Sequence, residues 1–331
     1  MKLLLNSYID NKLKLVEKKY ALIIGLNPSG GARSPKLWNK VYKKKKIKCK
    51  MYPADVKPNN LSNIVKFLKK DPNFIGGSIT IPYKEKIIKY LDKVDVNSKK
   101  INSINTILKK NNKLIGFNTD YSGFGRSLNK FNIKKKDAIL VLGAGGAGKA
   151  AISFIINNFK ENKKYFFNRT PQKLTSFLKT HNKKKIFILK NYKSIYKITN
   201  IKLVVNTTSI GFNSWFYSKR KFYNLKYFSP LAPLKQVELI NKKENKLFLK
   251  KNKQNIERNI KKSKQFFKDN PNAKVYDIIY TPIKTNIMKH ADIFKSFNLN
   301  GLNMNLDQAV IAFSKVNKIK SFDEIKKIMK K

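Results

Sequence analysis

The sequence predicts an α/β fold with two domains. Three observations lead to this prediction: the length of 331 residues, the alternation of short apolar runs with amphipathic stretches, and a glycine-rich loop at residues 143–148. A chain of this length usually forms about two domains. Alternating strand-like and helix-like segments are typical of an architecture in which helices cover a largely parallel sheet.

The first third of the chain is predicted to form one α/β domain. Residues 19–28 are an apolar run that ends in Gly, Asn and Pro, as expected of a buried strand followed by a loop. Residues 34–44 have helical spacing, with Pro35 in the first turn, where proline is tolerated. Residues 75–82 are predicted to form another strand, and residues 101–120 two short strands around an Asn-Asn turn.

From residue 138 the pattern changes to the strand–helix–strand order of a nucleotide-binding domain. Residues 138–158 run from an apolar strand through glycines into a helix. Further strands are predicted at residues 163–170, 202–212 and 274–280.

The region after the nucleotide-binding pattern is less regular. Residues 213–274 show little periodicity and are predicted to be irregular, with a lysine-rich insertion at about 235–272. Two helices are predicted to end the chain, at 301–316 and 321–331. Ser321 and Glu324 have the spacing of a capping box at the start of the second of these helices.

The charge of the chain is extreme, with 73 Lys plus Arg against 19 Asp plus Glu and a net charge of +54. Such a charge fits a polyanionic partner, either nucleic acid or an anionic membrane. Two features favour compositional drift instead. Only five of the basic residues are Arg, the usual reader of guanine edges, and lysine is spread along the whole chain rather than gathered in one stripe. We therefore expect no specific nucleic-acid partner.

Several other classes are disfavoured by composition. The single cysteine, Cys49, allows neither an internal disulfide nor a cysteine-based zinc site. His181 and His290 are far apart and are expected to be ordinary side chains, so no metal is expected. No apolar run approaches the roughly 18–20 residues of a membrane span, and the N-terminal leucines are too few for a signal peptide. The expected location is the cytoplasm.

The glycine loop fits two nucleotide-binding patterns. Gly143, Gly145 and Gly148 fit G-x-G-x-x-G between a strand and a helix, and Lys149 extends the same stretch to G-x-x-x-x-G-K. A phosphate-binding loop of the NTPase type needs Ser or Thr next, because that hydroxyl binds Mg²⁺, and this chain has Ala150. The dinucleotide pattern is therefore favoured. Its candidate residues are Gly143, Ala144, Gly145, Gly146, Ala147 and Gly148.

The strand after the glycine loop indicates which dinucleotide binds. An NAD site places an acidic residue at the end of this strand, on the ribose 2′-hydroxyl. Here the strand ends in residues 166–173, FFNRTPQK, which contain no acid. Arg169 is a fixed cation suited to a 2′-phosphate, which predicts NADP(H), with Lys173 in support. The alternative is that Arg169 is an ordinary surface residue at a strand end.

Polar clusters elsewhere in the chain lie at strand ends and helix starts, where α/β domains place their chemistry. Taken in order with the glycine loop, these segments resemble the shikimate dehydrogenase family. The segments that carry the resemblance are GARSPKLWN (31–39), ITIPYK (79–84), INTI (104–107), GFNTDYSG (116–123), LGAGGAG (142–148), NRTPQK (168–173), VVNTTSIG (204–211), YDIIYTPIKT (276–285) and GLNMNLDQA (301–309). They cover nearly the whole chain, with 213–274 the main exception.

The resemblance implies NADPH-dependent reduction of 3-dehydroshikimate to shikimate, in chorismate and aromatic amino acid biosynthesis. It implies a substrate-binding and catalytic domain at 1–122, a Rossmann-type NADP-binding domain at 123–298, and C-terminal helices at 299–331 that return to the substrate domain. The expected partner is a small-molecule substrate, with no membrane, and a homodimer is left open.

The resemblance also assigns roles to individual residues. Lys84 is implied to be the catalytic cation and Asp120 its carboxylate partner. Substrate contacts are implied for Ser34, Thr80, Asn105, Tyr280 and Gln308. Cofactor contacts outside the glycine loop are implied for Asn168, Arg169, Thr170, Lys173, Asn206, Thr208 and Gly301.

This sequence departs from the family pattern at three places. Ala32 replaces the first serine of S-x-S-P, which removes one hydrogen bond to the substrate carboxylate, worth about 0.5–1.5 kcal/mol. Arg33 or a lysine is a candidate to compensate. Ser78 replaces an asparagine. In the last helix, Asn303, Asn305 and Asp307 replace small or apolar residues.

Four other functions stay open from the sequence. They are a quinate/shikimate dehydrogenase of broader specificity, a P-loop NTPase or small-molecule kinase, a basic nucleic-acid-binding protein, and an inactive relative of the family. The altered loop at Ala32 leaves the quinate/shikimate dehydrogenase open, and the glycine loop with Lys149 suggests the NTPase or kinase. The net charge suggests the nucleic-acid-binding protein, and the drifted composition suggests the inactive relative. Ala150 speaks against the NTPase, and the presence of both Lys84 and Asp120 speaks against the inactive relative.

Overall fold

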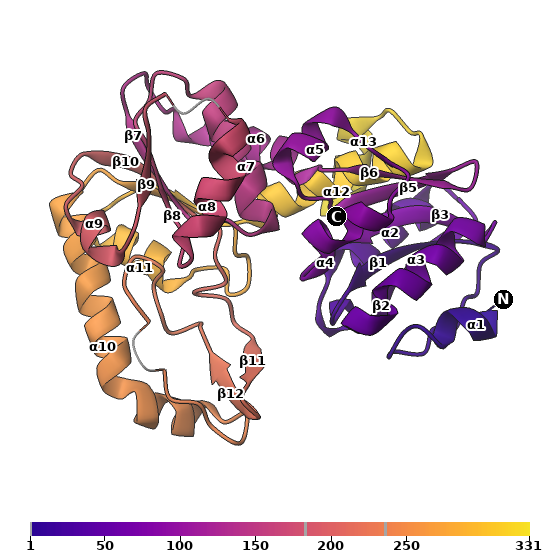
Figure 1. Cartoon of the computed structure of the whole chain (residues 1–331), viewed down its shortest axis with the longest axis horizontal. Helices are drawn as coiled ribbons and strands as arrows, with labels where there is room; N and C mark the ends of the chain where they lie inside the picture. The colour runs from indigo at the N-terminus through magenta and orange to yellow at the C-terminus, as the bar shows by residue number, and fades with distance from the viewer. Residues whose placement is uncertain (1, 182–183, 235–236) are drawn as a thin grey trace. The chain divides into compact units, whose positions relative to one another are not determined.

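A computed structural model describes residues 2–181, 184–234 and 237–331 of the chain (Figure 1). The chain forms two compact units. The first unit is discontinuous and consists of Met1–Arg126 with Met304–Lys331, and the second consists of Ser127–Asn303. Both contain a mainly parallel sheet with helices, which confirms the predicted α/β fold class.

The first unit is built on a six-stranded mixed sheet. Strand β1 pairs in parallel with β2 and β3, whereas β5 pairs antiparallel with β3 and β6. In sheet order the strands are β2 (Cys49–Asp55), β1 (Lys19–Gly25), β3 (Phe74–Ile79), β5 (Thr106–Lys110), β6 (Lys113–Phe117) and β4 (Lys93–Val94). The hairpin of β5 and β6 turns at Asn111 and Asn112, which both have positive φ, as the predicted Asn-Asn turn requires.

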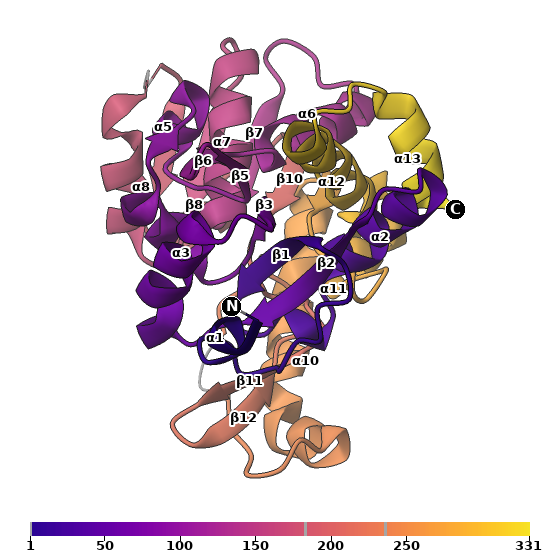
Figure 2. The ribbon, with the colours of Figure 1, turned by 90° about the vertical axis from the view of Figure 1, so that its right-hand side faces the viewer.

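The helices of the first unit lie on both faces of this sheet (Figure 2). Alternate residues of β1 explain why: Tyr20, Leu22 and Ile24 pack in one apolar cluster, and Ala21 and Ile23 in another. The first cluster includes residues of α3, and the second includes residues of α2, α12 and α13. The helices are α1 (Lys2–Asn6), α2 (Arg33–Lys44), α3 (Leu61–Lys70), α4 (Tyr83–Lys86), α5 (Val96–Ile101), α6 (Asp120–Leu128), α12 (Leu302–Asn317) and α13 (Phe322–Lys330).

The second unit has a six-stranded sheet whose strand pairs are all parallel. Its central strand β7 is buried at every position, as expected of a strand covered on both faces. In sheet order the strands are β14 (Asn298–Leu299), β13 (Lys274–Asp277), β10 (Ile201–Asn206), β7 (Ala138–Leu142), β8 (Lys164–Phe167) and β9 (Ile186–Leu189). The helices are α7 (Gly146–Asn158), α8 (Pro171–Phe177), α9 (Tyr192–Tyr196), α10 (Asn245–Asp269) and α11 (Asn286–Ile293).

The prediction that residues 213–274 are irregular was wrong. This region contains a hairpin, β11 (Trp215–Ser218) and β12 (Lys221–Asn224), and the 25-residue helix α10 (Figure 1). Phe248 and Ile256 of α10 pack with aromatic and aliphatic side chains of residues 210–240 in a separate apolar cluster. Residues 235–236, at the start of the predicted insertion, lie outside the described residues.

The inner face of α10 is partly polar, which is why its helical period was hidden in the sequence. Asn252 and Asn259 are buried and face the neighbouring loop. Asn252 accepts a hydrogen bond from the Glu238 amide at 2.8 Å, and Asn259 accepts one from the Ser229 amide at 2.7 Å. These side chains take the place of main-chain partners for the loop, so the buried polar groups are satisfied.

The capping box predicted at Ser321 and Glu324 does not form. Ser321 stands at the N-cap of α13, but among the described residues its side chain makes no capping hydrogen bond. Glu324 instead forms an ion pair with Lys45, at 2.7 Å between Nζ and Oε1. The Glu324 carboxylate is thus directed to Lys45 rather than to the helix terminus.

His290 on α11 is buried and is expected to make the second unit sensitive to acid. Its Nδ1 lies 2.8 Å from the Ser263 hydroxyl, and burial lowers the pKa of His290 to about 4, with Lys264 and Lys289 adding to the effect. Because the folded-state pKa lies below the unfolded value of about 6.5, the stabilisation is complete above that pH and is lost as the pH falls toward 4. In urea unfolding, the free energy of unfolding of the wild type should fall relative to that of His290→Gln by roughly 2–3 kcal/mol from pH 7.5 to pH 4.5.

The comparison with His290→Gln is needed because Asp277 acts in the opposite sense. Burial raises the pKa of Asp277 to about 6, so its contribution to stability declines as the pH rises through that value. Asp277 is present in both proteins, so the gap between them isolates the histidine. A gap that stays constant over this pH range would contradict the prediction.

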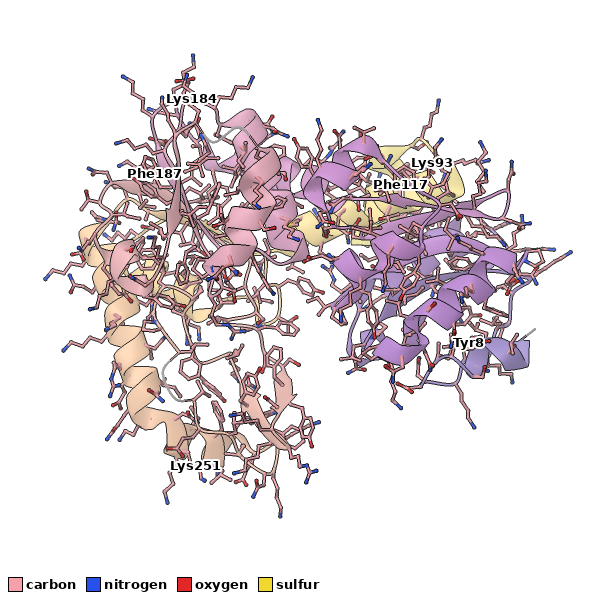
Figure 3. All side chains as sticks on the ribbon, in the orientation of Figure 1. Tyr8, Lys93, Phe117, Lys184, Phe187 and Lys251 are labelled. Atoms are coloured by element: carbon pink, nitrogen blue, oxygen red, sulfur yellow. The ribbon has the colours of Figure 1, made fainter. Side chains whose placement is uncertain are left out.

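Many side chains that end in a nitrogen atom project outward from both units (Figure 3). Lys93 and Lys251, both labelled there, are exposed. Lys164 is an exception, with 1% exposure, and its ammonium donates to the carbonyl oxygens of Phe159, Lys160 and Asn162. Among residues 2–181, 184–234 and 237–331, no helix combines the length and the apolar composition that a membrane span requires. The same residues contain no group of three His, Cys, Asp or Glu side chains that would hold a metal.

Candidate functional site

The first unit places Lys84 and Asp120 in direct contact. Lys84 lies on α4, a few residues after the end of β3, and Asp120 is the first residue of α6, just after β6. The Lys84 Nζ and the Asp120 Oδ2 are 2.6 Å apart. The Asp120 side chain is 7% exposed and that of Lys84 18%. The carboxylate is thus largely shielded, while part of the lysine side chain stays open to solvent.

Asn105 holds the carboxylate of this pair from the other side. Its Nδ2 donates to the Asp120 Oδ1 at 2.8 Å, and its Oδ1 accepts from the Thr119 amide at 2.8 Å. Asn105 follows the loop that enters β5, which brings it beside the end of β6 because the two strands form a hairpin. Gln308 of α12 completes the cluster, with its Oε1 3.2 Å from the Asn105 Nδ2.

This arrangement suits the reduction of a carbonyl group. A fixed ammonium can stabilise negative charge that develops on an oxygen atom and can donate a proton to it. The carboxylate of Asp120 keeps the ammonium in place through a charge-assisted hydrogen bond. Asp120 is in turn fixed by Asn105, so the position of the cation is set by a buried polar network rather than by a flexible surface chain.

The remaining predicted substrate residues belong to both units. Ser34 is buried in the first turn of α2, and Thr80 is half-buried just after β3. Asn105 and Gln308 are part of the network described above. Tyr280 is half-buried and follows β13, and it belongs to the second unit.

The glycine loop connects β7 to α7 in the second unit. Gly143 has φ +100, which favours glycine, and a Cβ there would approach Thr207 and Thr208 to within 3 Å. A Cβ at Gly148 would come within 2.6 Å of the Thr207 hydroxyl. At Gly145, the N-cap of α7, a Cβ would meet no described atom within 4 Å. Two of the glycines are therefore needed for packing, and the third leaves open space at a helix N-terminus, which fits a dinucleotide pyrophosphate.

Gly145→Ala should separate cofactor binding from folding. The added methyl group meets nothing in the described structure, so the melting temperature should change by less than about 2 °C, whereas NADPH affinity should fall about 10-fold or more because the pyrophosphate approaches the backbone there. Gly148→Ala is the matched variant and should lower the melting temperature as well. Thermal unfolding and NADPH titration would measure both, and unchanged affinity in Gly145→Ala would contradict this reading of the loop.

The next candidate residues directly follow β8, which is the strand that comes after the glycine loop in the sequence. Asn168 accepts a hydrogen bond from the Ala144 amide at 3.1 Å and donates to the Thr170 carbonyl at 2.9 Å, so it links the two loops. Arg169 and Lys173 are exposed cations. Burial raises the pKa of the Tyr192 hydroxyl to about 12, and the positive charge of Arg169 acts to lower it.

A buried aspartate that the sequence analysis did not single out supports the neighbouring loop. Asp277, fully buried at the end of β13, accepts hydrogen bonds from the Asn206 side-chain Nδ2 at 3.0 Å and from the Thr285 hydroxyl at 2.6 Å. Asn206 is also fully buried and accepts from the Thr208 amide and hydroxyl, at 3.0 and 2.8 Å. Asn206 thus orients Thr208 from inside the unit. In the sequence, Asp277 lies within a predicted strand and within the segment 276–285, one of those that carry the family resemblance.

Gly301 is set by packing against β13. A Cβ at this position would overlap the main chain of Ile278, and the Gly301 amide donates to the Ile279 carbonyl at 3.0 Å. The glycine therefore allows the start of α12 to pass close to the segment that carries Tyr280.

Comparison with known proteins reveals the family. A family model described as the shikimate dehydrogenase substrate binding domain matches residues 23–107. A protein of Clostridium botulinum (strain Hall) named shikimate dehydrogenase (NADP(+)) is 31% identical over 85% of this chain and 90% of its own length. A protein of the same name from Pelagibacter ubique is 33% identical over 89% of this chain and 92% of its own.

The chain belongs to the shikimate dehydrogenase family. Its fold agrees with this assignment, since the crystal structure of shikimate dehydrogenase from Aquifex aeolicus superimposes with a TM-score of 0.69 at 24% identity. That match covers 96% of this chain and all of the other. The segment matched by the shikimate dehydrogenase substrate binding domain contains Ser34, Thr80, Lys84 and Asn105.

Proposed function

We propose that this chain catalyses the NADPH-dependent reduction of 3-dehydroshikimate to shikimate. The observation that carries the proposal is the Lys84–Asp120 pair, fixed by Asn105 and Gln308, in a member of the shikimate dehydrogenase family. Relatives from Clostridium botulinum and Pelagibacter ubique bear the name shikimate dehydrogenase (NADP(+)). The reaction is a step of aromatic amino acid biosynthesis.

The residues of the first unit supply the acid and the positive charge for this reaction. When bound, NADPH supplies the hydride that reduces the ring ketone. The Lys84 ammonium stabilises the oxyanion that develops on the ketone oxygen and donates the proton that completes the alcohol. Asp120 keeps Lys84 in position and accepts a hydrogen bond from a substrate hydroxyl. The substrate carboxylate is proposed to be bound by Ser34 and Tyr280. The ring hydroxyls or the carboxylate are proposed to contact Thr80, Asn105 and Gln308.

The second unit is proposed to bind NADP(H). The open space at Gly145 fits the pyrophosphate, and the exposed guanidinium of Arg169, supported by Lys173, fits the 2′-phosphate. Asn168 and Thr170 shape the same edge, and Thr208 is presented by Asn206 on the loop after β10. The NTPase alternative is disfavoured because Ala150 is fully buried in α7 and has no hydroxyl for Mg²⁺.

The experiment that tests the proposal is a substrate and cofactor comparison. Purified protein should oxidise shikimate with NADP⁺, followed by the absorbance of NADPH, with a higher kcat/KM than for quinate or for NAD⁺. Equal or better turnover of quinate would replace the proposal with a quinate/shikimate dehydrogenase. Absence of NADP⁺ reduction with either compound, in protein that is folded and binds NADPH, would contradict the proposed activity.

A further inference from the structure

Two residues that lie at, or next to, departures from the family pattern are in contact in the first unit. Arg33 directly follows Ala32, where the usual loop serine is missing, and Asn305 stands where the family pattern has an apolar residue. The Arg33 Nη1 donates a hydrogen bond to the Asn305 Oδ1 at 3.0 Å. The guanidinium of Arg33, which is next in sequence to the missing hydroxyl, therefore contacts the new side-chain amide of Asn305.

The same pair is linked to the proposed catalytic residues. The Gln308 Nε2 donates to the Asn305 carbonyl at 3.0 Å, and Gln308 in turn reaches Asn105, which holds Asp120. Arg33 thus lies at one end of a hydrogen-bonded chain whose other end is Lys84. Its neighbour Ser34, on the first turn of α2, is the proposed ligand of the substrate carboxylate.

The chemistry of Arg33 matches what the loop has lost. A guanidinium presents five N–H donors in a planar fork that fits a carboxylate, and its hydrogen bonds to an anion are stronger than those of a neutral hydroxyl. Asn305 accepts one of these N–H groups and so fixes the plane of the fork. Arg33 is half-buried, which lowers the screening of its charge by water.

A purely structural role as a tie between α2 and α12 explains less. The two helices are already joined by an apolar cluster that includes Leu37 and Trp38 from α2 and Phe313 from α12. The Trp38 and Phe313 rings lie 5.3 Å apart in an edge-to-face arrangement, and Trp38 is fully buried. A polar contact on a half-buried rim, such as that of Arg33 with Asn305, adds little to packing of this kind.

We propose that Arg33, oriented by Asn305, binds the substrate carboxylate together with Ser34 and replaces the hydroxyl that is missing at Ala32. The inference rests on the proposed function, since it concerns the same substrate. It makes Arg33 a substrate-binding residue and Asn305 a positioning residue. It also makes binding depend on the charge of the substrate more strongly than a pair of hydroxyls would.

The test is a kinetic comparison of Arg33 variants with shikimate and with its methyl ester, which lacks the negative charge. Arg33→Ala should raise the KM for shikimate about 10- to 100-fold and leave kcat within about threefold of wild type, because one charge-assisted contact is lost in ground and transition state alike. Its KM for the ester should change by less than about threefold. The KM of Arg33→Lys for shikimate should lie between those of the wild type and Arg33→Ala, since lysine keeps the charge but lacks the planar fork of N–H donors.

Two further variants separate orientation and position from charge. Asn305→Ala removes the side chain that orients Arg33 but keeps the carbonyl that Gln308 uses, and it should raise the KM for shikimate about 3- to 10-fold. Lys36→Ala is the matched control, an exposed cation one turn along α2, and it should leave the KM unchanged. Adding Ala32→Ser to Arg33→Ala should recover part of the lost affinity.

The outcomes distinguish this inference from the proposed function. If the wild type oxidises shikimate and Arg33→Ala keeps its KM, or loses shikimate and ester affinity equally, the inference is overturned and the proposed function stands. If Arg33→Ala fails to fold, the decision falls to Asn305→Ala, whose unchanged preference for shikimate over the ester would overturn the inference. A wild type that does not oxidise shikimate overturns the proposed function, and the inference with it.

Discussion

Replacing Lys84 with alanine should lower kcat for shikimate oxidation by about 10²- to 10⁴-fold, the usual range for loss of a positioned acid–base group. The ammonium lies 2.6 Å from Asp120, and no other lysine pairs with that carboxylate in the part of the chain that the structure describes. The KM for NADP⁺ should stay within about threefold of wild type, because Lys84 belongs to the first unit and the glycine loop to the second. Steady-state kinetics with shikimate and NADP⁺ would measure both quantities.

Lys86 provides a matched control for this variant. It lies two residues further along α4, is exposed, and belongs to the same run of charged residues, so Lys86→Ala should retain wild-type kcat. Asp120→Asn, which keeps the shape but removes the charge that holds Lys84, should also lower kcat. Turnover near the wild-type level in Lys84→Ala would refute the assigned role.

Replacing Arg169 with alanine should remove most of the preference for NADP(H) over NAD(H). The guanidinium is exposed beyond the end of β8, where a 2′-phosphate is expected, and a hydrogen-bonded contact with a doubly charged group is worth about 1.5–3 kcal/mol. The KM for NADPH should therefore rise about 10- to 100-fold, whereas the KM for NADH should change by less than about threefold. Initial rates with the two cofactors at saturating 3-dehydroshikimate would test this.

Arg220 is the natural control for Arg169 because it is also an exposed arginine of the second unit. It lies at the turn between β11 and β12, away from the loops after β7 and β8 in the sequence. Arg220→Ala should leave both cofactor constants unchanged. If Arg169→Ala raised the KM for NADPH and the KM for NADH equally, Arg169 would contact a part common to both cofactors. The proposed selection through the 2′-phosphate would then be wrong.

The sequence indicated the fold wherever apolar pattern and turn chemistry agree. The buried strand β7, the glycines that follow it and the Asn111–Asn112 turn each have a local physical cause, and each lies where it was predicted. The Lys84–Asp120 contact was predicted from two loops 36 residues apart, with the resemblance to a family supplying the pairing. Local pattern alone would not have selected these two residues.

The features that the sequence did not indicate depend on polar contacts between distant segments. Helix α10 was missed because Asn252 and Asn259 stand on its inner face, where a hydrophobic period would need apolar residues. The Arg33–Asn305 hydrogen bond joins residues 272 positions apart, and no local pattern marks such a pair. Asp277 looks like an ordinary strand-end carboxylate until its partners are known.

Burial alone would have selected the wrong lysine. Lys164 is 1% exposed, and burial lowers its pKa, yet its ammonium faces three main-chain carbonyls that close the turn before β8. Lys84 is more exposed than Lys164 but faces a carboxylate. The kind of partner, rather than the degree of burial, distinguishes a lysine suited to chemistry from one that stabilises a loop.

The discontinuity of the first unit has a consequence for how the protein is made. Gln308 and Asn305 come from α12, which the ribosome adds only after the entire second unit, and domains generally fold as units during synthesis. A chain that ends before α12 therefore contains every strand of both sheets but lacks two members of the amide network around Asp120. The network can close only after α12 has been made, so the ability to position substrate is expected to be the last property that the first unit gains.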